Sequence, residues 1–163
     1  MPGTSGRLSL DLIKCSAKRI SAPATCTEAD LRRATSDLDY ALFHALCEEL
    51  AQLVAEAPTD AGYRDSFTML YRMPNHGPVV QRCRDAIGRS DMTTVQKEFA
   101  ETLMTMKAKR DLADYDPFAV FNISEVGNDL MNVTRTLNRF LAEKEKERRR
   151  LALFLGLDVR RAR

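Results

Sequence analysis

The sequence predicts an all-α fold, an up-and-down bundle of four to five helices with a long C-terminal helix. Apolar residues recur at steps of three and four over most of the 163-residue chain, which is the spacing of one buried helix face. Clusters of proline and glycine separate these periodic segments. No alternating strand pattern and no internal repeat is present. We expect residues 1–6 to be disordered and residues 7–163 to form one helical domain.

The longest helix of the N-terminal half is expected over residues 28–57. Thr27 is a natural N-cap, and Asp30 lies at the acidic position three residues later. The apolar stripe of this helix consists of Leu31, Ala34, Leu38, Ala41, Leu42, Ala45, Leu46, Leu50, Leu53 and Val54. A shorter helix is expected before it, over residues 8–20.

Four further helices follow from the same periodicity. Their expected ranges are 60–72, 79–87, 94–112 and 125–155. Two prolines and a glycine in residues 73–78 are expected to separate the helix over residues 60–72 from the helix over residues 79–87. Ser124 is expected to cap the last helix, which would be about 45 Å long at about 1.5 Å per residue.

The composition is typical of a soluble globular protein, with 44% hydrophobic and 29% charged residues. There is no run of about 18 apolar residues, and the N-terminus lacks the basic-then-apolar plan of a secretory signal. A cytoplasmic protein with no membrane partner is therefore expected. The four cysteines are widely spaced and include no Cys-x-x-Cys pair, which disfavours a zinc site and a disulfide framework. We expect reduced cysteines and no cofactor.

Basic charge is concentrated in residues 143–163, where eight Lys or Arg residues stand against four Asp or Glu. Because the net charge is +2, the rest of the chain is near −2. Such a tail can contact phosphates or membrane surfaces, or it can be a solvated helix end. The large apolar residues in this region, Leu151, Leu153, Phe154, Leu155 and Leu157, need cover from the bundle or from a second subunit.

The helix expected over residues 28–57 carries a polar face. Arg33, Asp37, Tyr40 and His44 follow one another at steps of four, three and four, so they share one side of the helix. This face can form a structural network with a neighbouring helix. It can also offer His44 for proton transfer while Arg33 binds an anion.

A second polar group ends the helix expected over residues 94–112. Arg110 and Asp114 are four residues apart, and Tyr115 and Asp116 follow. Acids at a helix C-terminus oppose the helix dipole, so we expect them to serve a partner such as Arg33 or to cap the next turn. No histidine or third acid adjoins them, and no metal site is predicted.

A third candidate is Arg72 with His76, at the proline-rich break. An arginine that binds phosphate and a histidine that shares a proton near neutral pH are the minimum needed to cleave RNA. The alternative is an exposed or capping loop histidine.

These segments together resemble the HEPN domain superfamily of prokaryotic helical-bundle proteins. The resemblance rests on Leu-Arg-Arg-Ala-Thr-Ser at 31–36, Asp-Tyr-Ala-Leu-Phe-His-Ala-Leu at 39–46 and Lys-Arg-Asp-Leu-Ala-Asp-Tyr-Asp-Pro at 109–117, and it covers about residues 28–155. It implies a four- or five-helix bundle, often a homodimer, in a superfamily linked to RNA cleavage, toxin–antitoxin pairs and phage defence.

Active HEPN ribonucleases carry an Arg-x(4–6)-His motif near the dimer interface. Here three residues separate Arg72 from His76, and ten separate Arg33 from His44, so neither pair has that spacing. Asp39 also stands where many members have the first tyrosine of a Tyr-Tyr pair.

The leading prediction is therefore a non-catalytic, HEPN-like interaction or RNA/nucleotide-binding module that is expected to form a homodimer. Its polar centre is expected to consist of Arg33, Tyr40, Arg110, Asp114 and Tyr115. The alternative is a divergent metal-independent endoribonuclease, of toxin or defence type, that uses Arg72 and His76. A third interpretation is a structural protein whose apolar C-terminal helix docks on another chain. The partners that these predictions imply are a second copy, RNA or a nucleotide, or an antitoxin-like protein.

Overall fold

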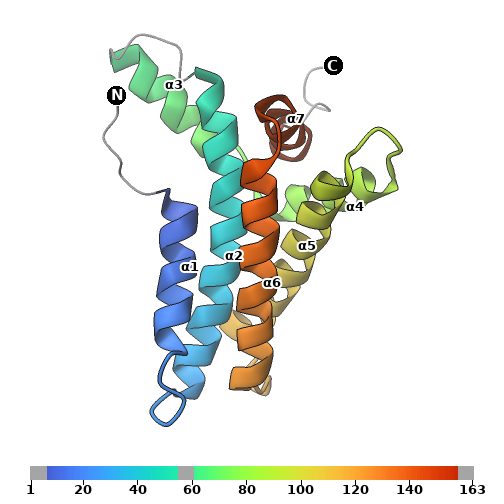
Figure 1. Ribbon diagram of the computed structural model, residues 1–163. Coiled ribbons are helices and arrows are strands. Elements are labelled where there is room, and N and C mark those ends of the chain that lie inside the picture. The colour runs from blue at the N-terminus through green and yellow to red at the C-terminus, as the bar shows by residue number, and fades with distance from the viewer. Residues whose placement is uncertain (1–6, 55–60, 158–163) are drawn as a thin grey trace.

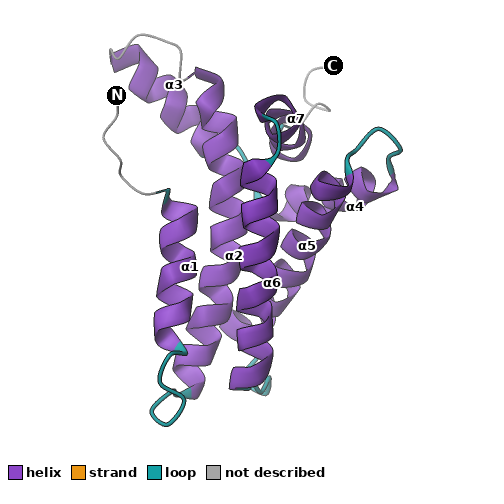
Figure 2. Cartoon of the chain, viewed as in Figure 1, coloured by secondary structure: helices purple, strands orange, loops and turns teal. Residues whose placement is uncertain are grey.

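The computed structural model describes residues 7–54 and 61–157, and this part of the chain is all-α, as predicted (Figure 1). Figure 2 shows helices and loops and no strand in it. The α-helices are α1 (Leu8–Arg19), α2 (Glu28–Ala51), α3 (Ala61–Tyr71), α4 (His76–Gly88), α5 (Thr94–Tyr115), α6 (Ile123–Ala142) and α7 (Glu145–Gly156). None of these helices is long and apolar enough to cross a bilayer.

Helix α2 contacts most of the other helices. In Figure 1 it runs beside α1 and α6, and it also packs against α3, α5 and α7. Its N-terminus has the predicted capping box, because Thr27 Oγ1 accepts the Asp30 amide at 3.2 Å and the Asp30 carboxylate accepts the Thr27 amide at 3.0 Å. The helix ends at Ala51 rather than Ala57, and a 3-10 turn, Gln52–Val54, follows it. The remainder of the predicted helix lies outside the described residues.

Leucines at four-residue steps of α2 form the centre of the core. These fully buried residues are Leu38, Leu42, Leu46 and Leu50. Apolar side chains of α5, α6 and α7 surround them, and the rings of Phe99 and Phe140 lie 4.3 Å apart in the same core. Burial of one such leucine stabilises the fold by about 1.5–3 kcal/mol. This packing fixes α5 against α2 and so positions the polar residues that both helices carry.

The segment predicted as one helix over residues 125–155 is divided into α6 and α7. The break lies at Glu143, whose backbone is extended with φ −66° and ψ 156°. Arg148 stabilises the break, because its Nη1 donates to the carbonyl oxygens of Glu143 at 2.6 Å and of Leu141 at 3.3 Å. The turn allows Leu151 and Leu155 to pack back into the core, where both are fully buried.

Helix α4 begins one turn earlier than predicted, at His76 instead of Val79. Asn75 is its N-cap, and Asn75 Oδ1 accepts the amide of Gly77 at 3.3 Å. The proline-rich break is therefore shorter than expected. As a result, His76 is the first residue of a helix rather than part of a free loop.

Two other helix ends also differ from the prediction. Helix α5 continues through Tyr115, past the predicted end at Leu112. The cap of α6 is Asn122 and not Ser124, since Asn122 Oδ1 accepts the amide of Glu125 at 2.8 Å. The end of α5 thus lies three residues from the predicted boundary and the start of α6 two residues from it.

The four cysteines are unpaired. Cys47 and Cys83 lie in the core, and burial raises the pKa of each thiol to about 12. Cys47 therefore packs as a small hydrophobic residue, as predicted.

Candidate functional site

A fully buried carboxylate on α2, Asp39, lies at the centre of the candidate site. Arg110 of α5 donates from Nη1 to Asp39 Oδ2 at 2.9 Å. Nε2 of His76, at the start of α4, lies 3.3 Å from the same oxygen. Three helices thus meet at one carboxylate. We call Asp39, Tyr40, His76, Arg110 and Asp114 the polar centre.

Arg110 is surrounded by acids and is only 8% exposed. Besides its bond to Asp39, its Nε lies 3.5 Å from Asp114 Oδ2 and its Nη2 lies 4.0 Å from Asp111 Oδ1. The guanidinium carbon is 4.9 Å from the centroid of the Tyr40 ring, a cation–π contact. Burial is the largest single influence on the pKa of Arg110 and lowers it, but the attraction of Asp39, Tyr40 and Asp111 together with the hydrogen bond to Asp39 raises the pKa overall. Arg110 is therefore a permanent cation that its neighbours neutralise.

His76 is held in place by aromatic rings as well as by charge. Its ring stacks on Phe43 with centroids 3.6 Å apart, and the Tyr40 ring meets it edge-on at 5.9 Å. Arg110 Nη1 lies 3.1 Å from the same Nε2 that faces Asp39. One nitrogen cannot both accept from Arg110 and donate to Asp39, so the tautomer of His76 decides which contact is the hydrogen bond. The side chain remains 21% exposed.

The second histidine of the chain, His44, lies beside the polar centre. Its Nδ1 is hydrogen-bonded to the hydroxyl of Tyr71 in α3, with 2.6 Å between the two atoms. Burial lowers the pKa of His44, and the charge of His76 lowers it further. Burial also raises the pKa of Tyr71 to about 12. At neutral pH this pair is therefore a hydrogen bond between two uncharged groups.

The C-terminal end of α5 is joined to α2 by two polar residues. Ser36 Oγ donates to Asp114 Oδ1 at 2.6 Å. Arg32 Nη1 donates to the carbonyl oxygens of Ala113 at 3.0 Å and Asp116 at 2.9 Å, and its Nη2 donates to that of Ala119. Arg32 thereby satisfies backbone acceptors that a helix terminus leaves unpaired.

The charge balance of the polar centre limits its chemistry. Three carboxylates, on Asp39, Asp111 and Asp114, lie within 4.0 Å of the one guanidinium of Arg110. Among the described atoms, Asp39 Oδ1 and Arg110 Nε are buried without a hydrogen-bond partner. A histidine oriented by a buried carboxylate can transfer a proton. An arginine with this many acidic neighbours is poorly suited to bind a phosphate, because the surrounding field is negative.

The structure brings five of the predicted site residues together and leaves the others apart. Those in or beside the polar centre are Tyr40, His44, His76, Arg110 and Asp114. Arg33 does not reach Asp114; its side chain is 60% exposed and lies 3.9 Å from Asp37. Asp37 instead pairs with Arg19 of α1 at 2.9 Å.

The remaining predicted residues point elsewhere. Arg72 is exposed, and no described hydrogen bond or ion pair joins it to His76; Arg110 is the arginine that His76 contacts. Tyr115 is 76% exposed. Asp116 is the C-cap of α5, and its Oδ1 accepts the amide of Phe118 at 2.8 Å.

Sequence reasoning did not identify Asp39, Phe43, Tyr71 or Arg32 as site residues. A signal existed for two of them, because Ser36, Asp39 and Phe43 follow at steps of three and four beside the apolar stripe of α2. An acidic residue beside a buried apolar stripe predicts that a basic or hydrogen-bonding side chain is buried next to it. Tyr71 and Arg32 reach the site only through tertiary packing.

We predict that folding stability depends on the ionisation of His44. Because its folded pKa is below the usual 6.5, the unfolded state binds its proton more readily. This contribution to stability is present above about pH 6.5 and is lost as the pH falls below it. Thermal unfolding followed by circular dichroism from about pH 7.5 to about pH 5.5 should show a steeper loss of Tm for the wild type than for His44→Gln, which cannot titrate.

Equal pH slopes for the two proteins would contradict this assignment. Glu48 lies nearby and has a pKa raised by burial, so its protonation favours the folded state at more acidic pH. Glu48 is present in both proteins. The difference between their slopes therefore isolates His44.

Among the described residues, no group of three or more His, Cys, Asp and Glu side chains is arranged to hold a metal ion. Comparisons of the chain with protein-family models, with curated proteins and with solved structures give no match.

Proposed function

We propose that this protein is a HEPN-like helical bundle that acts as a non-catalytic interaction module and works as a homodimer. The stretches that carry the resemblance to HEPN domains belong to two parts of the chain, α2 (residues 31–36 and 39–46) and the end of α5 with the turn after it (residues 109–117), and α2 packs on α5. Ser36 of the first donates to Asp114 of the second, and Arg32 of the first donates to Ala113 of the second. The polar residues of these segments thus hold two helices together.

The observation that carries the proposal is the state of Arg110. It is 8% exposed and lies within 4.0 Å of three carboxylates. An arginine that binds RNA or a nucleotide must offer its charge to a phosphate. Because the charge of Arg110 is already neutralised, the polar centre is better suited to fixing α2, α4 and α5 than to binding nucleic acid. This favours the interaction function over the RNA/nucleotide-binding function.

One observation favours endoribonuclease activity as the second candidate. Both histidines of the chain lie on or beside the polar centre, and Asp39 orients His76 as a carboxylate orients a catalytic base. In this version His76 is the base and Arg110, rather than Arg72, is the neighbouring cation. His76 is also accessible enough for its proton to exchange.

An RNA-cleavage assay without metal ions separates the two candidates. We predict that the purified protein and its His76→Ala variant leave a labelled RNA equally intact, because Arg110 cannot stabilise the charge of the transition state. The matched control is Arg72→Ala, which removes the exposed arginine of the original pair.

Cleavage by the wild type that His76→Ala abolishes at unchanged Tm would establish the ribonuclease and refute the non-catalytic proposal. If Arg72→Ala also abolished cleavage, Arg72 would be part of the catalytic site, as the sequence first suggested. Sedimentation equilibrium tests the homodimer in the same samples, and a monomer at every concentration would rule it out.

A further inference from the structure

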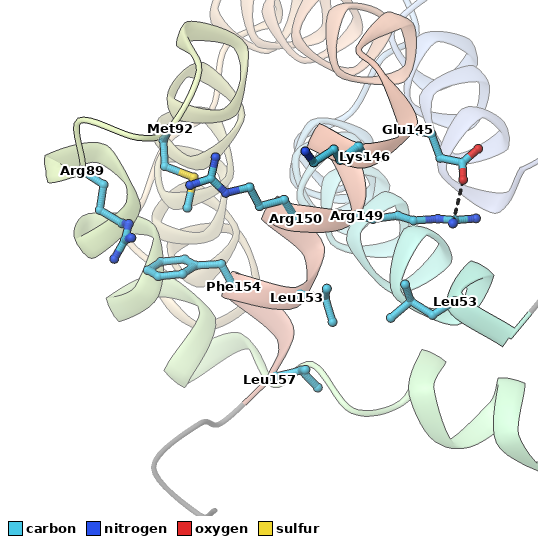
Figure 3. A pocket seen from close by; sticks show the side chains of 10 residues that line it. All are labelled: Leu53, Arg89, Met92, Glu145, Lys146, Arg149, Arg150, Leu153, Phe154 and Leu157. Atoms are coloured by element: carbon cyan, nitrogen blue, oxygen red, sulfur yellow. Dashed lines mark ion pairs between the residues drawn. The ribbon is translucent and has the colours of Figure 1, made fainter.

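A groove beside α7 shares no lining residue with the polar centre (Figure 3). Its volume is about 770 Å³, in the range of about 300–1,000 Å³ typical of ligand sites. The lining comes from three parts of the chain. Leu53 lies in the turn after α2, Arg89 and Met92 lie between α4 and α5, and the remaining side chains belong to residues 145–157.

The floor of the groove is an apolar face at α7 that the described part of the bundle covers only in part. Leu151 and Leu155 on the core side of this helix are fully buried. Leu153, Phe154 and Leu157 are only partly buried and line the groove. The core therefore buries one apolar face of this region completely, at Leu151 and Leu155, and contacts the other face only in part. The sequence predicted that the apolar residues of this C-terminal region need to be covered by other apolar groups, and this second face still has room for such a covering group.

The rim of the groove is basic. Four cationic side chains line it, from Arg89, Lys146, Arg149 and Arg150, against the single acid Glu145. Figure 3 shows Lys146, Arg149 and Arg150 along one edge of the apolar floor and Arg89 beside Phe154. An occupant with negative charge at its edges and an apolar centre is complementary to this arrangement.

Ion pairs within the chain hold the rim arginines in position. Arg149 Nη1 lies 2.6 Å from Glu145, a pair drawn in Figure 3. Arg89 makes two hydrogen bonds to Asp91, at 2.7 and 2.8 Å, and its guanidinium lies over the Phe154 ring at 5.2 Å. Solvent screens such exposed pairs, so each contributes little to stability. A partner carboxylate can therefore join or replace them at little cost.

We propose that the groove binds an acidic amphipathic helix of a partner protein. The apolar face of that helix would cover Leu153, Phe154 and Leu157, and its flanking carboxylates would pair with Lys146 and Arg149. This inference deepens the proposed function, on which it rests, by naming the kind of partner that the interaction module takes.

Other occupants fit the groove less well. RNA would satisfy the basic rim but would leave the side chains of Leu153 and Leu157 without aliphatic contacts. Residues 158–163 of this chain contain three arginines and one aspartate, so their charge has the same sign as the rim. A second copy remains as a distinct outcome of the test.

The probe is a fluorescein-labelled peptide of about 14 residues, or about 21 Å of helix, with leucines on one face and glutamates on the other. We expect fluorescence anisotropy to report a Kd of about 10 μM for the wild type. Leu153→Glu should weaken binding at least tenfold, and Lys146→Glu, at an exposed rim position, should weaken it severalfold. The matched control is Leu112→Glu on α5, an exposed leucine far from the groove in sequence, which should leave the Kd unchanged.

Unchanged binding by Leu153→Glu and Lys146→Glu would overturn the inference. Equal affinity for a peptide with lysine in place of glutamate would also overturn it. A wild-type dimer that Leu153→Glu converts to a folded monomer would instead identify the groove as the interface between two copies. If the protein neither binds the peptide nor cleaves RNA, only this inference is refuted. If the protein cleaves RNA, only the non-catalytic function is refuted.

Discussion

Replacing Asp39 with alanine is expected to lower the free energy of unfolding by about 3–5 kcal/mol, the cost of leaving a buried charge without its partner. Asp39 is fully buried, and its Oδ2 is 2.9 Å from Arg110 Nη1. The variant keeps the cation of Arg110 but loses the closest carboxylate. A domain of this size has a total free energy of unfolding of only about 5–15 kcal/mol. The expected loss is therefore a large fraction of the total stability. Urea denaturation followed by circular dichroism measures it.

A double-mutant cycle tests whether the loss comes from Arg110. In an Arg110→Met background, Asp39→Ala should cost at least about 1 kcal/mol less than in the wild type, because no cation is left unpaired. Asp114→Ala is the matched control. Asp114 lies 3.5 Å from Arg110 Nε and its side chain is 28% exposed, so its removal should cost about 1–2 kcal/mol. Equal costs for Asp39→Ala and Asp114→Ala would show that the buried pair is not the main link between α2 and α5.

The second large effect is expected for Arg148→Met, at about 3 kcal/mol. Glu49 of α2 is 1% exposed, and its Oε1 lies 2.9 Å from Arg148 Nε and 3.1 Å from Arg7 Nη1. Arg148 also donates to two carbonyl oxygens at the end of α6. The variant therefore weakens the pairing of a buried carboxylate and leaves the turn between α6 and α7 without its donor. The same urea denaturation measures the change.

The matched control for this variant is Arg150→Met on the same helix. Arg150 pairs with Asp91, and both side chains are about 40% exposed, so the cost should stay below about 1 kcal/mol. Adding Glu49→Gln to Arg148→Met should recover part of the lost stability, because the buried charge is then absent. Equal effects of Arg148→Met and Arg150→Met would contradict the proposed role of the buried pair.

The sequence by itself determined the helical class and much of the local structure. The capping box at Thr27 and Asp30 and the apolar stripe from Leu31 to Leu50 occur as predicted, since capping and periodicity depend on residues within one or two turns. Leu53, which was also predicted in the stripe, is instead 37% exposed in the turn after α2. Local signals were weaker at helix ends. Asn75 and Asn122 are the caps of α4 and α6, whereas the sequence predicted that α4 starts at Val79 and that Ser124 caps α6.

Only the tertiary structure decided which polar groups meet. Periodicity placed Tyr40 and His44 on one face of α2, but it could not identify the helix that faces them. Arg110 pairs with Asp39, which is 71 positions away in the chain. Asp114 contacts Ser36 and Arg110 rather than Arg33, the partner suggested from sequence. Likewise, the break at Glu143 and the groove beside α7 depend on Arg148 reaching back to α2 and α6. A helical pattern specifies which side of a helix is buried, whereas the partner on that side is chosen by packing between segments distant in sequence.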